Sequence, residues 1–223
     1  MSYYETLKRV TINPKFFLYL LLGAAFSMFL ASLTTITPHS LGLLHKNILL
    51  AWIPLLAALF GRSIKETAIV GYPLWLISLS VWIFFLPNAF YIVTDFIHLG
   101  EGPGVLFWLK NLTLYLSATI SLLAGVYSIE LVRPQLFSFQ KLHMWWLFNI
   151  IISLLVGIGV YFGRFSRLNS WDVLEPSKIA DSVRTLLDQH LVITEWGFVL
   201  VFSFMTLIFI NIFHALISRT IGD

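Results

Sequence analysis

Long apolar stretches separated by short polar connections recur along the whole chain. A helix needs about 17–25 mostly apolar residues to cross the hydrocarbon core of a bilayer. Five stretches reach that length, and a shorter sixth contains Trp52 and Pro54. We therefore predict an all-α fold, a single polytopic membrane helical bundle of about six transmembrane helices. The predicted spans lie near residues 16–36, 47–60, 68–86, 105–129, 143–162 and 194–217.

The amino-acid composition supports a membrane location. Hydrophobic residues make up 58% of the 223 residues and charged residues 11%, whereas about a quarter of the residues in soluble domains are charged. The chain has no cysteine, which excludes disulfides, thiolate metal ligands and a cysteine nucleophile. Its net charge of +3 comes without a dense basic cluster, so we expect membrane lipids and no nucleic acid as partners.

Lysine and arginine in short loops indicate orientation, because such loops tend to stay in the cytoplasm. The short connections around Arg62 and Arg133 are basic, and six spans place both on the side of the amino terminus. We therefore expect a bacterial inner-membrane protein whose amino and carboxyl termini are cytoplasmic. In that topology the loops near residues 87–104 and 163–193 share the extracytoplasmic face and can meet.

The segment LPNAFYIVTDFIHL, residues 86–99, places polar groups inside an apolar run. The run extends from about Thr67 to Leu99, which is too long for one upright span of about 20 residues. Pro87 disfavours helical backbone at the residue before it. We expect the third span to end or bend near Leu86, and a short interfacial or re-entrant helix to start at Pro87.

Four polar residues of this segment share one face of an ideal α-helix: Asn88, Tyr91, Asp95 and His98. Ionisable groups within a membrane are costly, so they suggest a function. A carboxylate followed three residues later by an imidazole can serve as a general acid and base, as half of a metal site, or as a purely structural pair. We take Asp95 and His98 as candidate catalytic residues, Asn88 and Tyr91 as candidate ligand-binding residues, and expect neither metal nor cofactor.

A second polar group, GRFSRLNSWD at residues 163–172, follows the fifth span. Its arginines can pair with Asp95, grip an anionic head group through the guanidinium fork, or extend to the membrane surface. The candidate ligand-binding residues here are Arg164, Arg167, Asn169 and Asp172.

Two further features are interpreted as structural or left open. Residues 177–191 have the pattern of an amphipathic surface helix, which would be either a lid over the site or a simple connector. Glu130 and Glu195 lie at predicted span ends, where an acid can be solvated, so we assign them no function.

The motifs LPNAFYIVTDFIHL, GRFSRLNSWDVL and NILLAWIPLLAAL (residues 47–59) resemble the bacterial membrane protein family called domain of unknown function thirteen sixty-one. The resemblance covers nearly the whole chain. It implies a multi-pass membrane fold and brings no established activity.

The leading functional hypothesis is an outward-facing polar pocket that binds an anionic or amphipathic small molecule, a lipid or a cell-envelope precursor. If the site is catalytic, Asp95 or His98 would transfer the proton and the arginines would hold charge. A small-solute transporter is one alternative, but it needs a polar path to the other side of the membrane. A structural or assembly subunit is the other. The sequence leaves the oligomeric state open.

Overall fold

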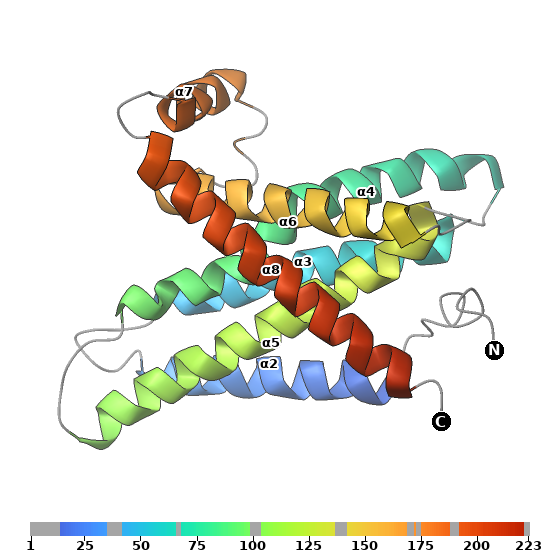
Figure 1. Cartoon of the computed structure of the whole chain (residues 1–223). Helices are drawn as coiled ribbons and strands as arrows, with labels where there is room; N and C mark the ends of the chain where they lie inside the picture. The colour runs from blue at the N-terminus through green and yellow to red at the C-terminus, as the bar shows by residue number, and fades with distance from the viewer. Residues whose placement is uncertain are drawn as a thin grey trace.

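The computed structural model describes residues 14–34, 42–65, 68–98, 104–136, 142–168, 172, 175–187 and 192–220. All the regular secondary structure in these ranges is helical. The elements in chain order are α2 (Pro14–Thr34), α3 (Gly42–Ile64), α4 (Ala68–Tyr91), the 3₁₀ helix η1 (Ile92–His98), α5 (Val105–Leu136), α6 (Leu142–Arg164), α7 (Pro176–Leu187) and α8 (Val192–Thr220) (Figure 1).

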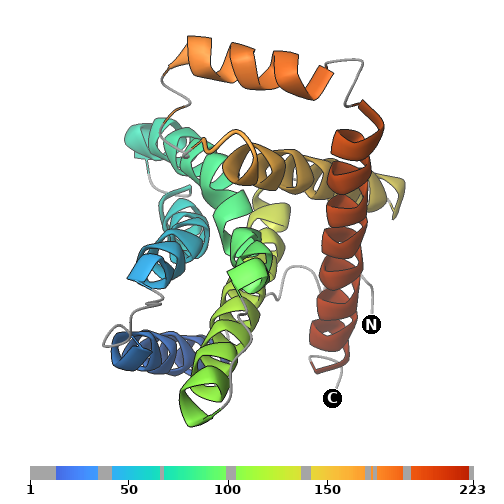
Figure 2. The same ribbon diagram turned by 90° about the vertical axis from the view of Figure 1, so that its left-hand side faces the viewer.

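Six of the described helices, all except α7 and η1, are long and apolar enough to cross a membrane. The prediction of an all-α, multi-pass bundle with six spans is therefore confirmed. The helix α2 begins, and α8 ends, at one end of the bundle, which we call the terminal end (Figure 1). The short helix α7 lies at one margin of the opposite end, the α7 end, above α4 and α6 in Figure 2 and at a steep angle to most of the long helices.

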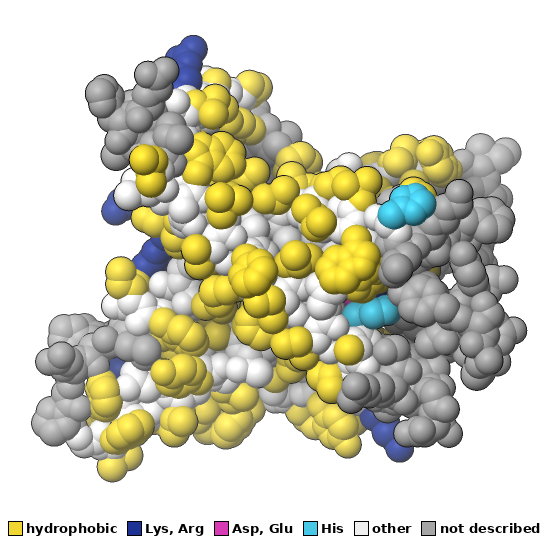
Figure 3. All heavy atoms as spheres, in the orientation of Figure 1, with side chains coloured by type: hydrophobic (Ala, Val, Ile, Leu, Met, Phe, Trp, Pro, Cys, Tyr) yellow, Lys and Arg dark blue, Asp and Glu magenta, His cyan; other side chains and the backbone are white. Residues whose placement is uncertain are grey.

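The outside of the bundle is apolar, as a lipid-facing surface requires. Large exposed hydrophobic side chains occur on every long helix, among them Phe29, Leu56, Ile77, Leu112 and Phe204. Figure 3 shows hydrophobic side chains across the middle of one face and Lys and Arg side chains at its margins. Inside, α3 packs along α4 and α5, α2 packs along α5, and α6 packs along α8.

Besides α4, two helices extend well beyond the apolar stretches that predict them. The second span runs through Pro54 and reaches 23 residues as α3. The fourth span continues beyond residue 129 to Leu136 as α5. Backbone hydrogen bonding explains both cases. Backbone N–H and C=O groups in a membrane need a hydrogen-bond partner, and a continuous helix supplies one within the segment, even where proline removes one N–H donor.

The expected helix boundary at Pro87 is wrong. The α-helix α4 continues through Pro87 to Tyr91, and the short helix begins at Ile92. Leu86 and Phe90, on either side of the proline, are each only 1% exposed, so tertiary packing holds this turn helical. The helix then tightens where three β-branched residues follow one another, because such side chains disfavour the α-helix. In addition, the hydroxyl of Thr94 donates to the carbonyl of Tyr91 at 2.7 Å.

Glycine on α6 allows α6 to approach α4 at this point. A Cβ atom on Gly159 would lie 2.3 Å from Cγ of Pro87, far inside van der Waals contact. One turn later, a Cβ atom on Gly163 would lie 3.3 Å from the Tyr91 ring. Small residues let membrane helices pack backbone to backbone. This contact brings Arg164 at the end of α6 close to the segment that follows α4.

Candidate functional site

Asp95 lies in η1 at the α7 end and is buried, with 9% of its surface exposed. Its two oxygens have partners on different helices. Asn47 Nδ2 of α3 donates to Oδ2 at 2.8 Å, and Arg164 Nη1 of α6 donates to Oδ1 at 3.4 Å. The carboxylate therefore joins three helical segments that are far apart in the sequence.

A cavity of about 720 Å³ adjoins this cluster, since Asn47 and Arg164 both line it. The volume is in the range of small-molecule sites. Its walls come from α3, α4, α6, the loop that follows α6, and α7. The lining residues are Lys46, Asn47, Leu50, Phe84, Pro87, Asn88, Tyr91, Gly159, Phe162, Gly163, Arg164, Arg167, Leu168, Asp172 and Ile179.

On α3 and α4 the side chains that line the cavity are polar near the α7 end and apolar deeper in the bundle, while Leu168 and Ile179 add apolar surface near the α7 end. On α3, Lys46 lies one turn closer to that end than Leu50. On α4, Asn88 lies one turn closer to it than Phe84. One turn along a helix is about 5.4 Å. The cavity therefore matches a ligand that is polar at one end and apolar at the other.

The charges that line the cavity favour an anion. Three lining residues, Lys46, Arg164 and Arg167, are cationic, and one, Asp172, is a carboxylate. Asp172 is buried and contacts the ammonium group of Lys178 on α7 at 3.2 Å. Low-dielectric walls concentrate the field of such charges and attract the opposite sign.

Arg167 has an unusual backbone conformation. Its φ of 54° lies in the left-handed region, which residues with a side chain seldom adopt. This turn reverses the chain after α6, so that the amide of Leu168 donates to the carbonyl of Phe162 at 3.1 Å. Backbone strain of this kind costs about 1–2 kcal/mol and persists where the surroundings impose it. Arg167, in this conformation, is one of the residues that line the cavity.

Lys178 fastens α7 to the loop that precedes it. Its ammonium group contacts Glu175 at 2.9 Å and Asp172 at 3.2 Å. Hydrogen bonds from Lys178 to these two carboxylates, Glu175 first and Asp172 second, raise the pKa of Lys178 above its ordinary value. Further along α7, buried Leu186 packs with Tyr161 of α6 and Val199 of α8. These contacts hold Ile179 of α7 against the cavity.

The structure brings most of the predicted site residues together. Asn88, Tyr91, Arg164, Arg167 and Asp172 line one cavity, and Asp95 contacts Arg164 directly. The amide of Asn88 also donates to the carbonyl of Phe85 in its own helix, at 3.1 Å. His98 ends η1, but its side chain lies outside the described part of the structure, as does the whole of Asn169.

Sequence reasoning missed Lys46 and Asn47, which contribute the α3 wall of the cavity and a hydrogen bond to Asp95. The predicted second span, residues 47–60, leaves Lys46 in the preceding loop and has Asn47 as its first residue, with no role assigned to either. The signal that could have found them is the adjacent cation and amide at the start of a predicted span, on the same face of the membrane as Asp95.

The sequence model of a family described as "Protein of unknown function (DUF1361)" matches residues 46–209. The chain belongs to this family. The matched range contains every residue that lines the cavity, so the cavity lies in the part of the chain that defines the DUF1361 family. No curated protein and no solved structure matches the chain. Among its described residues, no three His, Asp or Glu side chains are grouped to hold a metal ion.

This DUF1361 protein also has a buried polar cluster towards the terminal end. Arg133 Nη1 lies 2.7 Å from Glu130 Oε2, and both residues are 1% exposed. Arg133 Nη2 donates to Asn149 Oδ1 of α6 at 3.0 Å, and His214 Nδ1 of α8 lies 3.2 Å from Glu130 Oε2. The Arg133 guanidinium also lies over the Trp145 ring, 5.3 Å from its centroid.

The expectation that Glu130 is solvated at a span end is therefore wrong. Because α5 continues to Leu136, Glu130 lies inside the bundle and depends on Arg133 for charge compensation. The cluster links α5, α6 and α8. Its members were separated in sequence by up to 84 positions, so no local pattern pointed to it.

Proposed function

We propose that this protein binds an anionic amphiphile, a molecule with a phosphate or carboxylate group and an apolar part, in the cavity at the α7 end. The observation that carries this proposal is the gradient of polarity in the cavity, from Lys46, Arg164 and Arg167 at one level to Leu50 and Phe84 one turn deeper. Cations and the guanidinium fork suit phosphate and carboxylate. The apolar level suits the rest of such a molecule.

In this proposal Asp95 is a positioning residue. One of its oxygens accepts a hydrogen bond from Asn47 and the other faces Arg164, so the carboxylate orients a guanidinium that also lines the cavity. The side chain of Arg164 is 20% exposed and has further N–H donors for a ligand. These contacts favour positioning over proton transfer as the role of Asp95.

The polar clusters at the two ends of the bundle are separated by packed apolar side chains on α6. Between Asn149 and Arg164 the helix has no charged residue: Ile152, Val156 and Val160 are each 3% exposed or less, and Ser153, 2% exposed, adds a buried hydroxyl. A transporter in this conformation would need a polar path through that layer. The arrangement therefore favours binding at the α7 end, which we place on the extracytoplasmic side of the bacterial inner membrane.

Native mass spectrometry of the protein, extracted in a mild detergent, tests the proposal. We expect a bound anionic molecule on the wild-type protein. The substitutions Arg164→Gln and Lys46→Gln should each lower its occupancy about tenfold or more, because a charge-assisted hydrogen bond contributes about 1.5–3 kcal/mol.

Arg184→Gln is the matched control, since Arg184 lies on α7 outside the cavity lining and its side chain is 81% exposed. That variant should retain wild-type occupancy. A neutral adduct, or an anionic adduct that survives both cavity substitutions, would contradict the proposal.

A further inference from the structure

The apolar level of the cavity connects with the outer, lipid-facing surface of α4. Phe84 lines the cavity, yet 47% of its surface is exposed. Ile77 and Val81 precede it by seven and three residues and are 60% and 36% exposed. These spacings place the three side chains on one face of the helix. We call this face the α4 strip.

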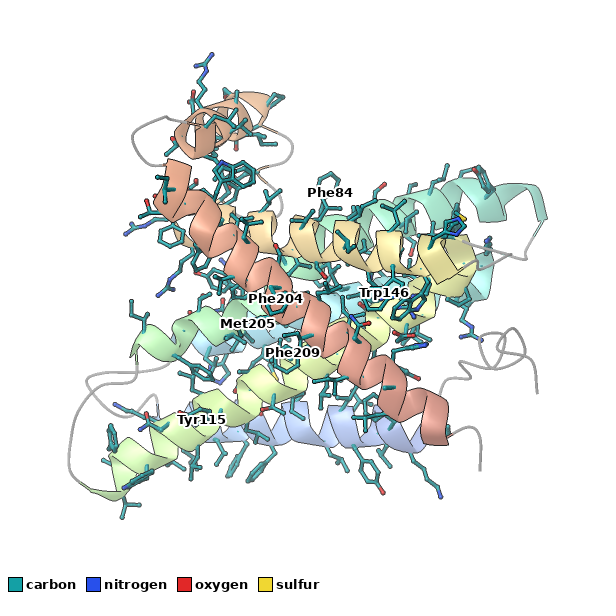
Figure 4. All side chains as sticks on the ribbon, in the orientation of Figure 1. Phe84, Tyr115, Trp146, Phe204, Met205 and Phe209 are labelled. Carbon is teal, nitrogen blue, oxygen red and sulfur yellow. The ribbon has the colours of Figure 1, made fainter. Side chains whose placement is uncertain are left out.

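Phe84 lies on the outside of the bundle. In Figure 4 its side chain points away from the other long helices, on the same side of the molecule as α7. A side chain that is both half exposed and part of a cavity wall marks an opening. Because the exposed side chains of the α4 strip are apolar, we expect this opening to face the hydrocarbon of a membrane.

The helix α7 lies beside this opening. Ile179 contributes to the cavity wall from α7, while Leu186 and the Lys178–Asp172 contact fix the helix at its two ends. The cavity is thus bounded by α7 at its polar level and by the α4 strip at its apolar level. Phe84 is the point at which the apolar α4 strip meets the cavity that Arg164 and Lys46 also line.

We propose that the bound molecule is a membrane phospholipid whose head group has a net negative charge, which enters sideways from the leaflet at the α7 end, past Phe84. This inference rests on the proposed function and names its ligand class. The phosphate lies among Lys46, Arg164 and Arg167, and the hydrocarbon chain stays in the bilayer along the α4 strip. A small soluble anion would gain nothing from the apolar level or from an opening toward lipid.

Site-specific photocrosslinking tests the route. The photoreactive residue p-benzoylphenylalanine replaces Phe84 in the full-length protein, which is placed in nanodiscs of phosphatidylethanolamine with phosphatidylglycerol as the minor component. Mass spectrometry identifies the crosslinked lipid. We expect phosphatidylglycerol to be enriched about tenfold over its share of the disc, which corresponds to roughly 1.4 kcal/mol of selectivity.

The same replacement at Phe204 is the matched control. Phe204 is 63% exposed on α8 and lies away from Phe84 and outside the cavity lining (Figure 4). Crosslinks there should follow the composition of the disc. Adding Arg164→Gln to the Phe84 variant should remove the enrichment, whereas an excess of inorganic phosphate should leave it unchanged.

The outcomes separate the two proposals. If crosslinks at Phe84 match the disc composition while native mass spectrometry still finds a bound anion, sideways entry of a lipid is wrong and the proposed function stands. If inorganic phosphate abolishes the enrichment, the site takes free phosphate and the lipid assignment is overturned. If neither experiment finds an anion that depends on Arg164, both proposals fail.

Discussion

Single residues at the site contribute mainly by fixing the positions of neighbouring residues and helices. Asp95 connects three helical segments because Asn47 and Arg164 donate hydrogen bonds to it from other helices. Gly159 allows α6 to pack closely on α4 because it has no side chain where α6 contacts Pro87. Neither property can be read from a residue type alone, since each depends on the helix packed against it.

Gly159 supplies a prediction about stability. Gly159→Ala places a methyl group 2.3 Å from the Pro87 ring, so α4 and α6 must separate. We expect a loss of about 1–3 kcal/mol, the usual cost of overpacking. Gly197→Ala in α8 is the control, because a Cβ atom there meets nothing within 4 Å, and it should be neutral or stabilising. Thermal unfolding in detergent measures both, and equal melting temperatures would refute the close contact.

The residues of the candidate site were partly predictable from the sequence, for a physical reason. Asp95 and Arg164 are conspicuous because a charge inside or beside an apolar run is costly and rare. Glu130 was misjudged because hydropathy falls before α5 ends, so the apolar pattern places the membrane boundary too early. Lys46 falls outside the predicted second span because hydropathy also rises only after α3 begins.

At the scale of elements, the buried ion pair of α5 contacts Asn149 of α6 and His214 of α8 and so connects the three helices. We predict that Arg133→Met destabilises the protein by about 3–5 kcal/mol, because it leaves Glu130 buried without its cation. The double variant Arg133→Met with Glu130→Gln should recover much of that loss. Chemical denaturation in micelles measures the free energy of unfolding.

An exposed pair provides the comparison for the buried one. Arg184 and Asp181 on α7 have side chains that are 81% and 74% exposed, and an ion pair in water contributes about 0–1 kcal/mol. Arg184→Met should therefore change the stability little. A similar loss for Arg133→Met and Arg184→Met would contradict the role of the buried cluster.

The contact that attaches α7 through Lys178 should weaken only as the pH rises. Glu175 and Asp172 raise the pKa of Lys178 above its ordinary 10.5, so the contact is fully present below that value and is lost as the pH rises through the raised pKa. A spin label at Ser177 should become more mobile only above about pH 10.5. In Lys178→Gln the label should be mobile at neutral pH as well. A label that is immobile in that variant would show that α7 is held by other contacts.

Element types were easier to predict than element ends. Six apolar blocks of the right length specify six helices, because the bilayer leaves the backbone few other options. The predicted boundary at Pro87 was wrong because tertiary packing overrode a local signal. A proline argues locally for a break, but Leu86 and Phe90 are buried against the bundle and tertiary packing continues α4 to Tyr91.

At the scale of the whole molecule, the two ends of the bundle should face different compartments. The chain has no native cysteine, so single cysteines report their side cleanly. Ser177 on α7 and Ser63 near the end of α3 are both exposed. We expect an impermeant thiol reagent added outside cells to label Ser177→Cys and not Ser63→Cys. Labelling of Ser63→Cys and not Ser177→Cys would show that the cavity faces the cytoplasm and that the predicted orientation is wrong.

The contacts of Asp95 also imply an order of assembly during synthesis. Its neutral partner, Asn47, emerges from the ribosome 48 residues before it, and its cationic partner, Arg164, emerges 69 residues after it. At about 5–20 residues per second, the delay before Arg164 appears is about 3–14 s. During that interval Asn47 has already been synthesised and can pair with the carboxylate. The insertion of α6 then adds the cationic partner.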